Sequence, residues 1–237
     1  MTRTLFLAAA ALLSSPALAQ APEPPSPERL RATVERLVSF GTRHTLSSAT
    51  DPARGIGAAR RWGAGELEGF SEACGGCLEV TTISDRFSGE RAPNGVIVEN
   101  VLAIQLGANP GRVVIIQGHI DSRVTDPLDF TSDSPGANDD GSGTALVIEA
   151  ARILSRERHD ATIVYALLSG EEQGLWGGEL LARHATEQGW QVLAVLNNDI
   201  VGNTVGTSGA VVDDRVRVFS EGIRASELDD PEATRIR

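Results

Sequence analysis

Three short runs made almost entirely of apolar residues constrain the fold of this chain more than any other feature. The runs are 113–116, 161–168 and 192–196, and segments with helical spacing of apolar residues separate them. A continuous apolar run of this length is typical of a strand buried on both faces of a largely parallel sheet. Strands that alternate with helices predict an α/β fold. We therefore expect three layers, αβα, around a central sheet that is mostly parallel but mixed.

Helix caps and turn residues predict the remaining elements. Ser26, Pro27 and Glu28 are typical of a helix start, since they can cap the helix, fit its first turn and favour the positive end of its dipole. We expect helices from Pro27 to Gly41, Asp51 to Ala73, Gly143 to Glu157, Gly174 to Gln188 and 215–237. We expect strands at 78–83 and 96–106, a polar loop at 84–95 and a turn at 109–111.

The N-terminus predicts a secretory signal segment. Arg3 precedes an apolar stretch from Leu5 to Leu13, and Ala17-Leu18-Ala19 offers a small-residue cleavage site. The apolar stretch is too short to cross a bilayer, so an uncleaved anchor or a buried helix is the less favoured alternative. We expect 1–19 to be removed, 20–26 to be a Pro-rich lead-in and 27–237 to be one domain. The protein is then exported, to the periplasm or the extracellular space.

The charge of the chain argues against two classes of partner. The formal net charge is −11. An acidic surface disfavours nucleic acid and anionic membranes. We expect no nucleic-acid partner and no membrane association beyond export, and the sequence leaves the oligomeric state open.

The two cysteines, Cys74 and Cys77, lie in a Cys-Gly-Gly-Cys segment. Behind a signal segment, a local disulfide is the favoured state, and the two glycines allow the tight turn that it needs. A pair of free thiols is the alternative. A zinc knuckle needs two more soft ligands, and the sequence holds no other cysteine.

Four acidic or histidine-bearing motifs form the candidate functional site. They are His119-Ile120-Asp121, 138–141 (Asn-Asp-Asp-Gly), Glu171-Glu172 and Asn198-Asp199, and three of them directly follow an apolar run. In an open α/β sheet, the carboxyl ends of the strands line the ligand crevice, so the motifs are expected to converge. One histidine with several carboxylates predicts a metal site, with zinc as the favoured ion.

Each motif also has a simpler interpretation. His119 could be a hydrogen-bonded structural residue, and Asp199 could be exposed in a loop. Asp140 could cap the next helix from a solvated turn, and a calcium loop is disfavoured because the periodic spacing of an EF-hand is absent. Glu171 and Glu172 could be an acidic first helical turn. Four unrelated roles would not explain why the motifs occur in order near successive strand ends. We therefore favour one shared site that contains all four motifs.

These motifs closely resemble those of the secreted co-catalytic di-zinc aminopeptidases, a peptidase family that also contains glutaminyl cyclases, glutamate carboxypeptidases and the transferrin-receptor ectodomain. The matching segments are 118–122, 136–143, 170–174, 198–199 and, near the N-terminus, 41–44. The resemblance covers the chain from Pro27 onward. It implies a zinc-exopeptidase-like fold and removal of N-terminal residues from peptides or small proteins.

The resemblance also implies a role for each matching residue. His119 and Asp199 would bind one zinc, Asp139 would bridge two zincs, and Glu172 would bind the second. Asp121 would hold the His119 ring, and Glu171 would be the general base in hydrolysis by metal-activated water. A cis peptide bond between Asp139 and Asp140 is implied as well.

One departure from the family pattern affects the second metal position. The family supplies its last zinc ligand from a histidine after the strand of Asp199, and this sequence has no histidine after His184. We therefore expect an incomplete second zinc site, a missing C-terminal part of the domain and weak or no activity of this chain alone. A non-catalytic binding module and a single-zinc acyltransferase of the glutaminyl cyclase type stay open, as does a carboxypeptidase preference.

Overall fold

The structure is a computed structural model that describes residues 23–218. The predicted signal segment and most of the expected helix at 215–237 lie outside these residues. Residues 215–218 are not helical. No helix within the described part of the chain is both long and apolar enough to span a membrane.

Five helices occur among the described residues. They are α1 (Pro27–Val38), α2 (Ile56–Ala73), α3 (Gly141–Leu154), α4 (Glu171–Gly174) and α5 (Trp176–Glu187). The hydroxyl oxygen of Ser26 caps α1 by accepting a hydrogen bond from the Arg29 N–H, as expected. The helix expected from Asp51 begins only at Ile56, because the Asp51 carboxylate accepts the next backbone N–H groups in a turn. The helix expected at 174–188 is divided from α4 at Leu175, whose φ is 62°.

Five strands form one mixed sheet. They are β1 (Glu79–Gly89), β2 (Ala92–Gln105), β3 (Asn109–His119), β4 (Ala161–Leu168) and β5 (Gln191–Asn197). The sheet order is β1-β2-β4-β3-β5, and β3 pairs in parallel with both β4 and β5. The β1–β2 and β2–β4 pairs are antiparallel. The carboxyl ends of β3, β4 and β5 therefore meet at one edge.

Two expected loops are wrong. Residues 84–95 continue β1 and β2 as a long hairpin, with Asp85 opposite Val98 and Phe87 opposite Val96. Polar residues fit such a hairpin because one face of an antiparallel pair can face solvent. The expected turn at 109–111 is the start of β3.

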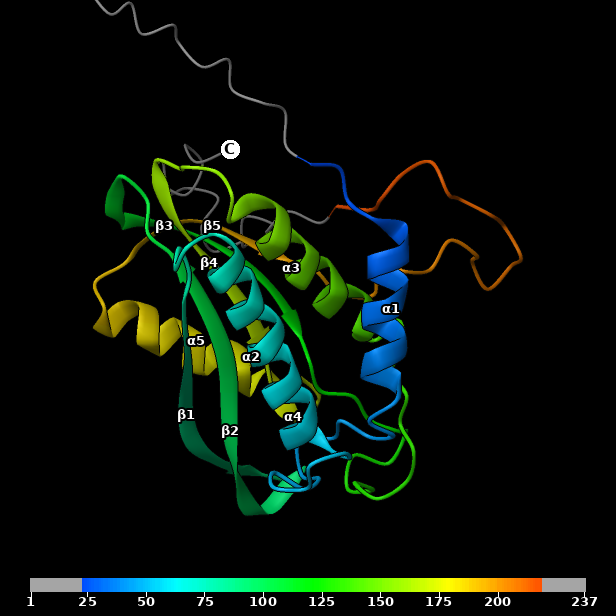
Figure 1. Cartoon of the computed structure of the whole chain (residues 1–237). Coiled ribbons are helices and arrows are strands. Elements are labelled where there is room, and N and C mark those ends of the chain that lie inside the picture. Colours follow the sequence, from blue (N-terminus) through cyan, green and yellow to red (C-terminus); the bar gives the residue numbers. More distant parts are fainter. Residues whose placement is uncertain (1–22, 219–237) are drawn as a thin grey trace, which may run out of the picture.

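Helices lie on both faces of the sheet, with α2 and α3 on one face and α5 on the other, which confirms the three-layer prediction (Figure 1). On one face α2 and α3 pack against a cluster that includes Ile116, Tyr165 and Leu167. On the other face α5 places Leu181 against a second cluster that includes Val164. Alternating residues of β4 thus contribute to opposite clusters, as expected for a strand buried on both faces.

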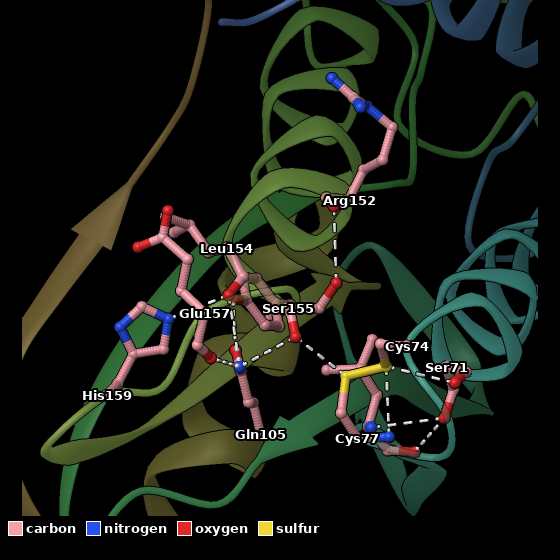
Figure 2. Close-up of a disulfide and its surroundings, with 11 residues drawn as sticks. Ser71, Cys74, Cys77, Gln105, Arg152, Leu154, Ser155, Glu157 and His159 are labelled. Atoms are coloured by element: carbon pink, nitrogen blue, oxygen red, sulfur yellow. Dashed lines mark hydrogen bonds between the residues drawn. A yellow bond between two sulfur atoms is a disulfide. The ribbon is translucent and has the colours of Figure 1, made fainter. Parts of the chain in front are cut away.

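The predicted disulfide between Cys74 and Cys77 is present, so the free-thiol alternative is wrong. It closes the turn after α2, and Cys77 Sγ lies 3.1 Å from the carbonyl oxygen of Ser155 at the end of α3. The side-chain amide of Gln105 donates to backbone carbonyls at the same helix end, including that of Glu157 at 2.8 Å. Figure 2 shows the disulfide beside these groups. This turn therefore joins the C-terminal ends of α2 and α3.

Strand β5 forms one edge of the sheet. Among the described residues its strand partner is β3 alone. Its apolar side chains are largely exposed, with Val195 at 50% and Leu196 at 52%. A cavity of about 390 Å³ opens beside it, lined in part by Trp190 and Leu181. An exposed apolar edge strand is open to pairing with another polypeptide segment.

Candidate metal and catalytic site

The imidazole of His119 is the centre of the site. His119 is the last residue of β3 and is 4% exposed. Its Nδ1 lies 3.1 Å from the backbone carbonyl oxygen of Asp121. A carbonyl only accepts, so Nδ1 carries the proton in the neutral ring and Nε2 keeps a lone pair. This arrangement leaves Nε2 as the atom that can bind a metal.

Two carboxylates converge on that nitrogen. Asp139 Oδ1 lies 3.2 Å and Asp199 Oδ1 lies 3.8 Å from His119 Nε2. Ligand atoms of the three residues lie within 4.8 Å of one another. They come from the end of β3, the loop before α3 and the loop after β5. The sheet therefore brings together three of the four predicted metal ligands.

The electrostatics of this group favour a bound cation. Burial lowers the pKa of His119, but its contacts with Asp121, Asp139 and Asp199 outweigh burial and raise the pKa above its ordinary value. The contact with His119 also lowers the pKa of Asp139. Imidazole nitrogen and carboxylate oxygen are both ligand atoms that zinc binds, and three protein ligands is the usual number in catalytic zinc sites. The donor set thus fits a divalent metal of the zinc type.

Asp121 is fully buried and connects the histidine to the two glutamates. Its Oδ1 lies 3.5 Å from His119 Nδ1, and its carboxylate accepts the backbone N–H groups of Glu171 and Glu172 at 3.3 and 3.2 Å. The hydroxyl of Thr45 donates to the same carboxylate at 2.9 Å. Burial alone would raise the pKa of Asp121, but these contacts lower it, so the carboxylate stays ionised.

The two glutamates at the start of α4 lie in different environments. Glu171 Oε2 is 4.0 Å from His119 Nε2, and its side chain is 30% exposed. Burial raises the pKa of Glu171. Glu172 is directed elsewhere, since its Oε2 lies 2.6 Å from the Nε of Arg123 in an ion pair. Within residues 23–218, Glu172 joins no group of three potential metal ligands.

A model of peptidase family M28 matches residues 100–221, which include His119, Asp139, Glu171 and Asp199. This chain belongs to peptidase family M28. A probable zinc metalloprotease of Pyricularia oryzae is 48% identical over 199 residues, covering 83% of this chain and 39% of that protein. A second, from Pyrenophora tritici-repentis, is 44% identical and covers 83% of this chain and 41% of its own length. The chain thus spans about two fifths of these two relatives.

Solved structures share the fold of this M28 chain. LapB from Legionella pneumophila superposes with a TM-score of 0.63 at 22% identity, covering 77% of this chain and 45% of that one. A glutaminyl cyclase from Porphyromonas gingivalis gives 0.61 at 22% identity, covering 75% and 62%. At such identities the likeness supports the zinc-exopeptidase-like fold and not a particular reaction.

Asp140 organises the M28 site in a way that its sequence position only partly indicates. It caps α3 through the N–H of Gly143 at 2.9 Å, as one interpretation predicted. Its carboxylate also accepts the backbone N–H of His119 at 3.1 Å and that of Ile200 at 3.3 Å. Burial raises its pKa to about 7. One side chain therefore fixes the residue positions of two candidate ligands, His119 and Asp199.

The peptide bond between Asp139 and Asp140 is cis, as the resemblance implied.

Arg43 supports the same site from the N-terminal part of the M28 chain. It is 1% exposed. Its Nε donates to the carbonyl of Ile120 at 2.7 Å, and its two terminal nitrogens donate to Pro135 and Gly136 at 2.7 and 2.9 Å. Burial lowers its pKa to about 10, so the group stays charged at neutral pH. In the sequence Arg43 stands out only as part of the matching segment 41–44, and its hydrogen bonds to three backbone carbonyls become visible only in the fold.

The other three histidines have structural contacts. The Nε2 of His44 lies 3.1 Å from the carbonyl oxygen of Pro127, and His44 is fully buried. His159 contacts the carbonyl of Leu154, and the His184 ring packs edge-on against Trp190. None of the three belongs to the group of three metal ligands found among the described residues.

Proposed function

We propose that this chain carries the zinc site and general base of an M28 exopeptidase that removes N-terminal residues from peptides. One observation carries the proposal: His119, Asp139 and Asp199 converge on one point, and Glu171 lies beside that point without being one of the three closest donors. The curated relatives in the comparison are named probable zinc metalloproteases, which supports zinc as the ion.

Each of these residues would have a separate role in peptide hydrolysis. His119, Asp139 and Asp199 would hold the ion, which when bound supplies Lewis acidity that polarises a carbonyl and acidifies water. Glu171 takes a proton from the attacking water and later donates it to the leaving amine. Its raised pKa makes it a stronger base than an ordinary surface glutamate. Asp121 positions both partners, because its carboxylate lies beside the His119 ring and accepts the Glu171 N–H.

The test compares Glu171→Gln with Glu187→Gln, which makes the same change at an exposed position of α5. Both proteins are assayed with leucine p-nitroanilide, its N-acetylated form and a zinc-binding measurement. We expect Glu171→Gln to bind zinc as the wild type does but to hydrolyse at least about 100-fold more slowly, the usual loss for a general base. The control should match the wild type.

Three results would contradict parts of this proposal. Equal cleavage of the acetylated substrate would exclude recognition of a free N-terminus. Full activity of Glu171→Gln would exclude its role as base. Zinc binding without any chelator-sensitive hydrolysis by the wild type would exclude hydrolysis by this chain alone, which the incomplete second zinc site also predicts, and would leave a non-catalytic binding module as the alternative.

A second candidate is cyclisation of N-terminal glutamine. It is favoured by one observation, namely that the described residues hold a single group of three metal ligands, which suits a reaction with one zinc. Release of ammonia from a glutaminyl peptide, without cleavage of the anilide, would support this candidate over peptide hydrolysis.

A further inference from the structure

The guanidinium of Arg123 lies on the side chain that the family resemblance assigns to a second zinc. Arg123 comes directly after the His119–Ser122 segment. Its Nε donates to Glu172 Oε2 at 2.6 Å, a short distance typical of a charge-assisted hydrogen bond. The Glu172 side chain is 10% exposed and that of Arg123 is 32% exposed. The pair is therefore partly buried at the site rather than free in solvent.

The protein holds the Arg123 head group in this position. Its Nη1 donates to the backbone carbonyls of Val124 and Thr125 at 3.2 and 3.3 Å. These contacts bend the guanidinium back over its own loop while Nε faces Glu172. A side chain anchored at two ends loses less freedom when it forms an ion pair.

The pair changes what Glu172 can bind. A buried carboxylate needs a compensating cation, and Arg123 supplies it. A zinc ion beside Glu172 would meet the positive guanidinium at hydrogen-bond distance from the same carboxylate. Among the described residues no third donor accompanies Glu172 and Asp139. While Arg123 is paired with Glu172, the residues present therefore fit one metal and do not fit a second.

We propose that Arg123 is a built-in cation that takes the place of a second zinc at Glu172, so that this chain binds one zinc, at His119, Asp139 and Asp199. The inference rests on the proposed function for the zinc site itself. Arg123 is a positioning residue in this arrangement, because it fixes Glu172 without contributing to the group of three ligands.

The experiment measures zinc per chain by elemental analysis after equilibrium dialysis of the 237-residue protein against zinc. We expect one zinc for the wild type. For Arg123→Ala and Arg123→Gln we expect a second zinc that is bound more weakly than the first, because both variants free the Glu172 carboxylate but only Glu172 and Asp139 then offer ligand atoms. Arg123→Lys keeps a cation and should stay at one. Arg91→Ala is the matched control, since Arg91 donates only to the backbone carbonyl of Glu172, and it should also stay at one.

Each outcome decides a separate point. Two zincs in the wild type would overturn the role of Arg123 and leave the proposed function standing. One zinc in every variant would likewise overturn it, because the guanidinium would then exclude nothing. No zinc in any protein would overturn the proposed function together with this inference. Circular dichroism of each variant separates a lost site from a lost fold, and the wild-type value tests the inference even where a variant fails to fold.

Discussion

Gly143, in the first turn of α3, is the position where one added carbon atom would disturb the candidate metal site most directly. A Cβ there would lie 2.2 Å from the backbone carbonyl oxygen of Asn198 and 2.5 Å from Asp140 Oδ2. Ordinary contact begins at 3.4 Å, so the Asn198 backbone would have to retreat by about 1.2 Å. Asn198 precedes Asp199, and Asp140 holds the His119 N–H, so Gly143→Ala displaces two of the three ligand positions.

The size of the effect follows from these displacements. Overpacking against backbone atoms typically costs about 1–3 kcal/mol of unfolding free energy. A misplacement of about 1 Å at a reactive centre can cost roughly 100-fold in rate, and disturbed support of a ligand typically costs about 10–100-fold in metal affinity. We expect Gly143→Ala to lose zinc affinity by at least about tenfold and to unfold at lower urea concentration.

Gly178→Ala is the control for this prediction. Gly178 occupies the third position of α5 as Gly143 does of α3, and a Cβ there meets nothing within 4 Å. Both variants are compared with the wild type by equilibrium dialysis with zinc and by urea unfolding. If Gly143→Ala bound zinc as tightly as Gly178→Ala does, the close approach of α3 to the loop after β5 would not position the site, and the reasoning would fail.

Two further predictions concern stability away from the site. Burial would raise the pKa of Glu149, but its hydrogen bonds, chiefly from Arg152, lower this pKa in the folded protein. The ionised Glu149 carboxylate therefore stabilises the fold above pH 4.5, and this stabilisation is lost as the pH falls through the pKa of the folded state. Glu149→Gln should therefore cost about 1–3 kcal/mol of unfolding free energy at pH 7 and progressively less as the pH falls below 4.5 in urea melts. A difference between variant and wild type that persists in acid would refute the ionic origin. In α2, Gly57→Ala should destabilise, since its Cβ would lie 2.0 Å from the carbonyl oxygen of Ala49, whereas Gly65→Ala meets nothing within 4 Å and should stabilise by roughly 0.5–1 kcal/mol. Equal melting temperatures for these two variants would contradict this assignment of packing.

The sequence predicted the ends of β3, β4 and β5 well because these strands are apolar on both faces. A polar residue directly after such a run marks the sheet edge without any knowledge of tertiary contacts. That is why His119, Glu171 and Asp199 could be assigned to one edge of the sheet. The hairpin at 84–95 was missed for the opposite reason. Its residues are polar because one face meets solvent, and pairing such as Asp85 with Val98 is fixed by long-range partners.

Arg123 and Asp140 show a second limit of sequence reasoning. In the sequence, Arg123 is indistinguishable from an ordinary exposed loop arginine, and only the folded chain shows that its side chain pairs with Glu172. The sequence indicates that Asp140 can cap a helix, but it does not indicate that the same carboxylate accepts the N–H groups of His119 and Ile200. Side chains that act through residues far along the chain carry no local pattern, so their roles become visible only with the fold.

Glycines at the site set how closely its elements approach one another. A Cβ on Gly118 would lie 2.9 Å from the carbonyl carbon of Gly143 in α3. Gly118 and Gly143 thus let β3 and α3 approach each other, and Gly143 lets α3 approach the loop that carries Asp199. Asp139 lies just before α3, and its Oδ1 is 3.2 Å from Nε2 of His119 at the end of β3. The positions of the candidate ligands therefore depend on the absence of a side chain at Gly118 and Gly143 as well as on the carboxylates and the imidazole themselves.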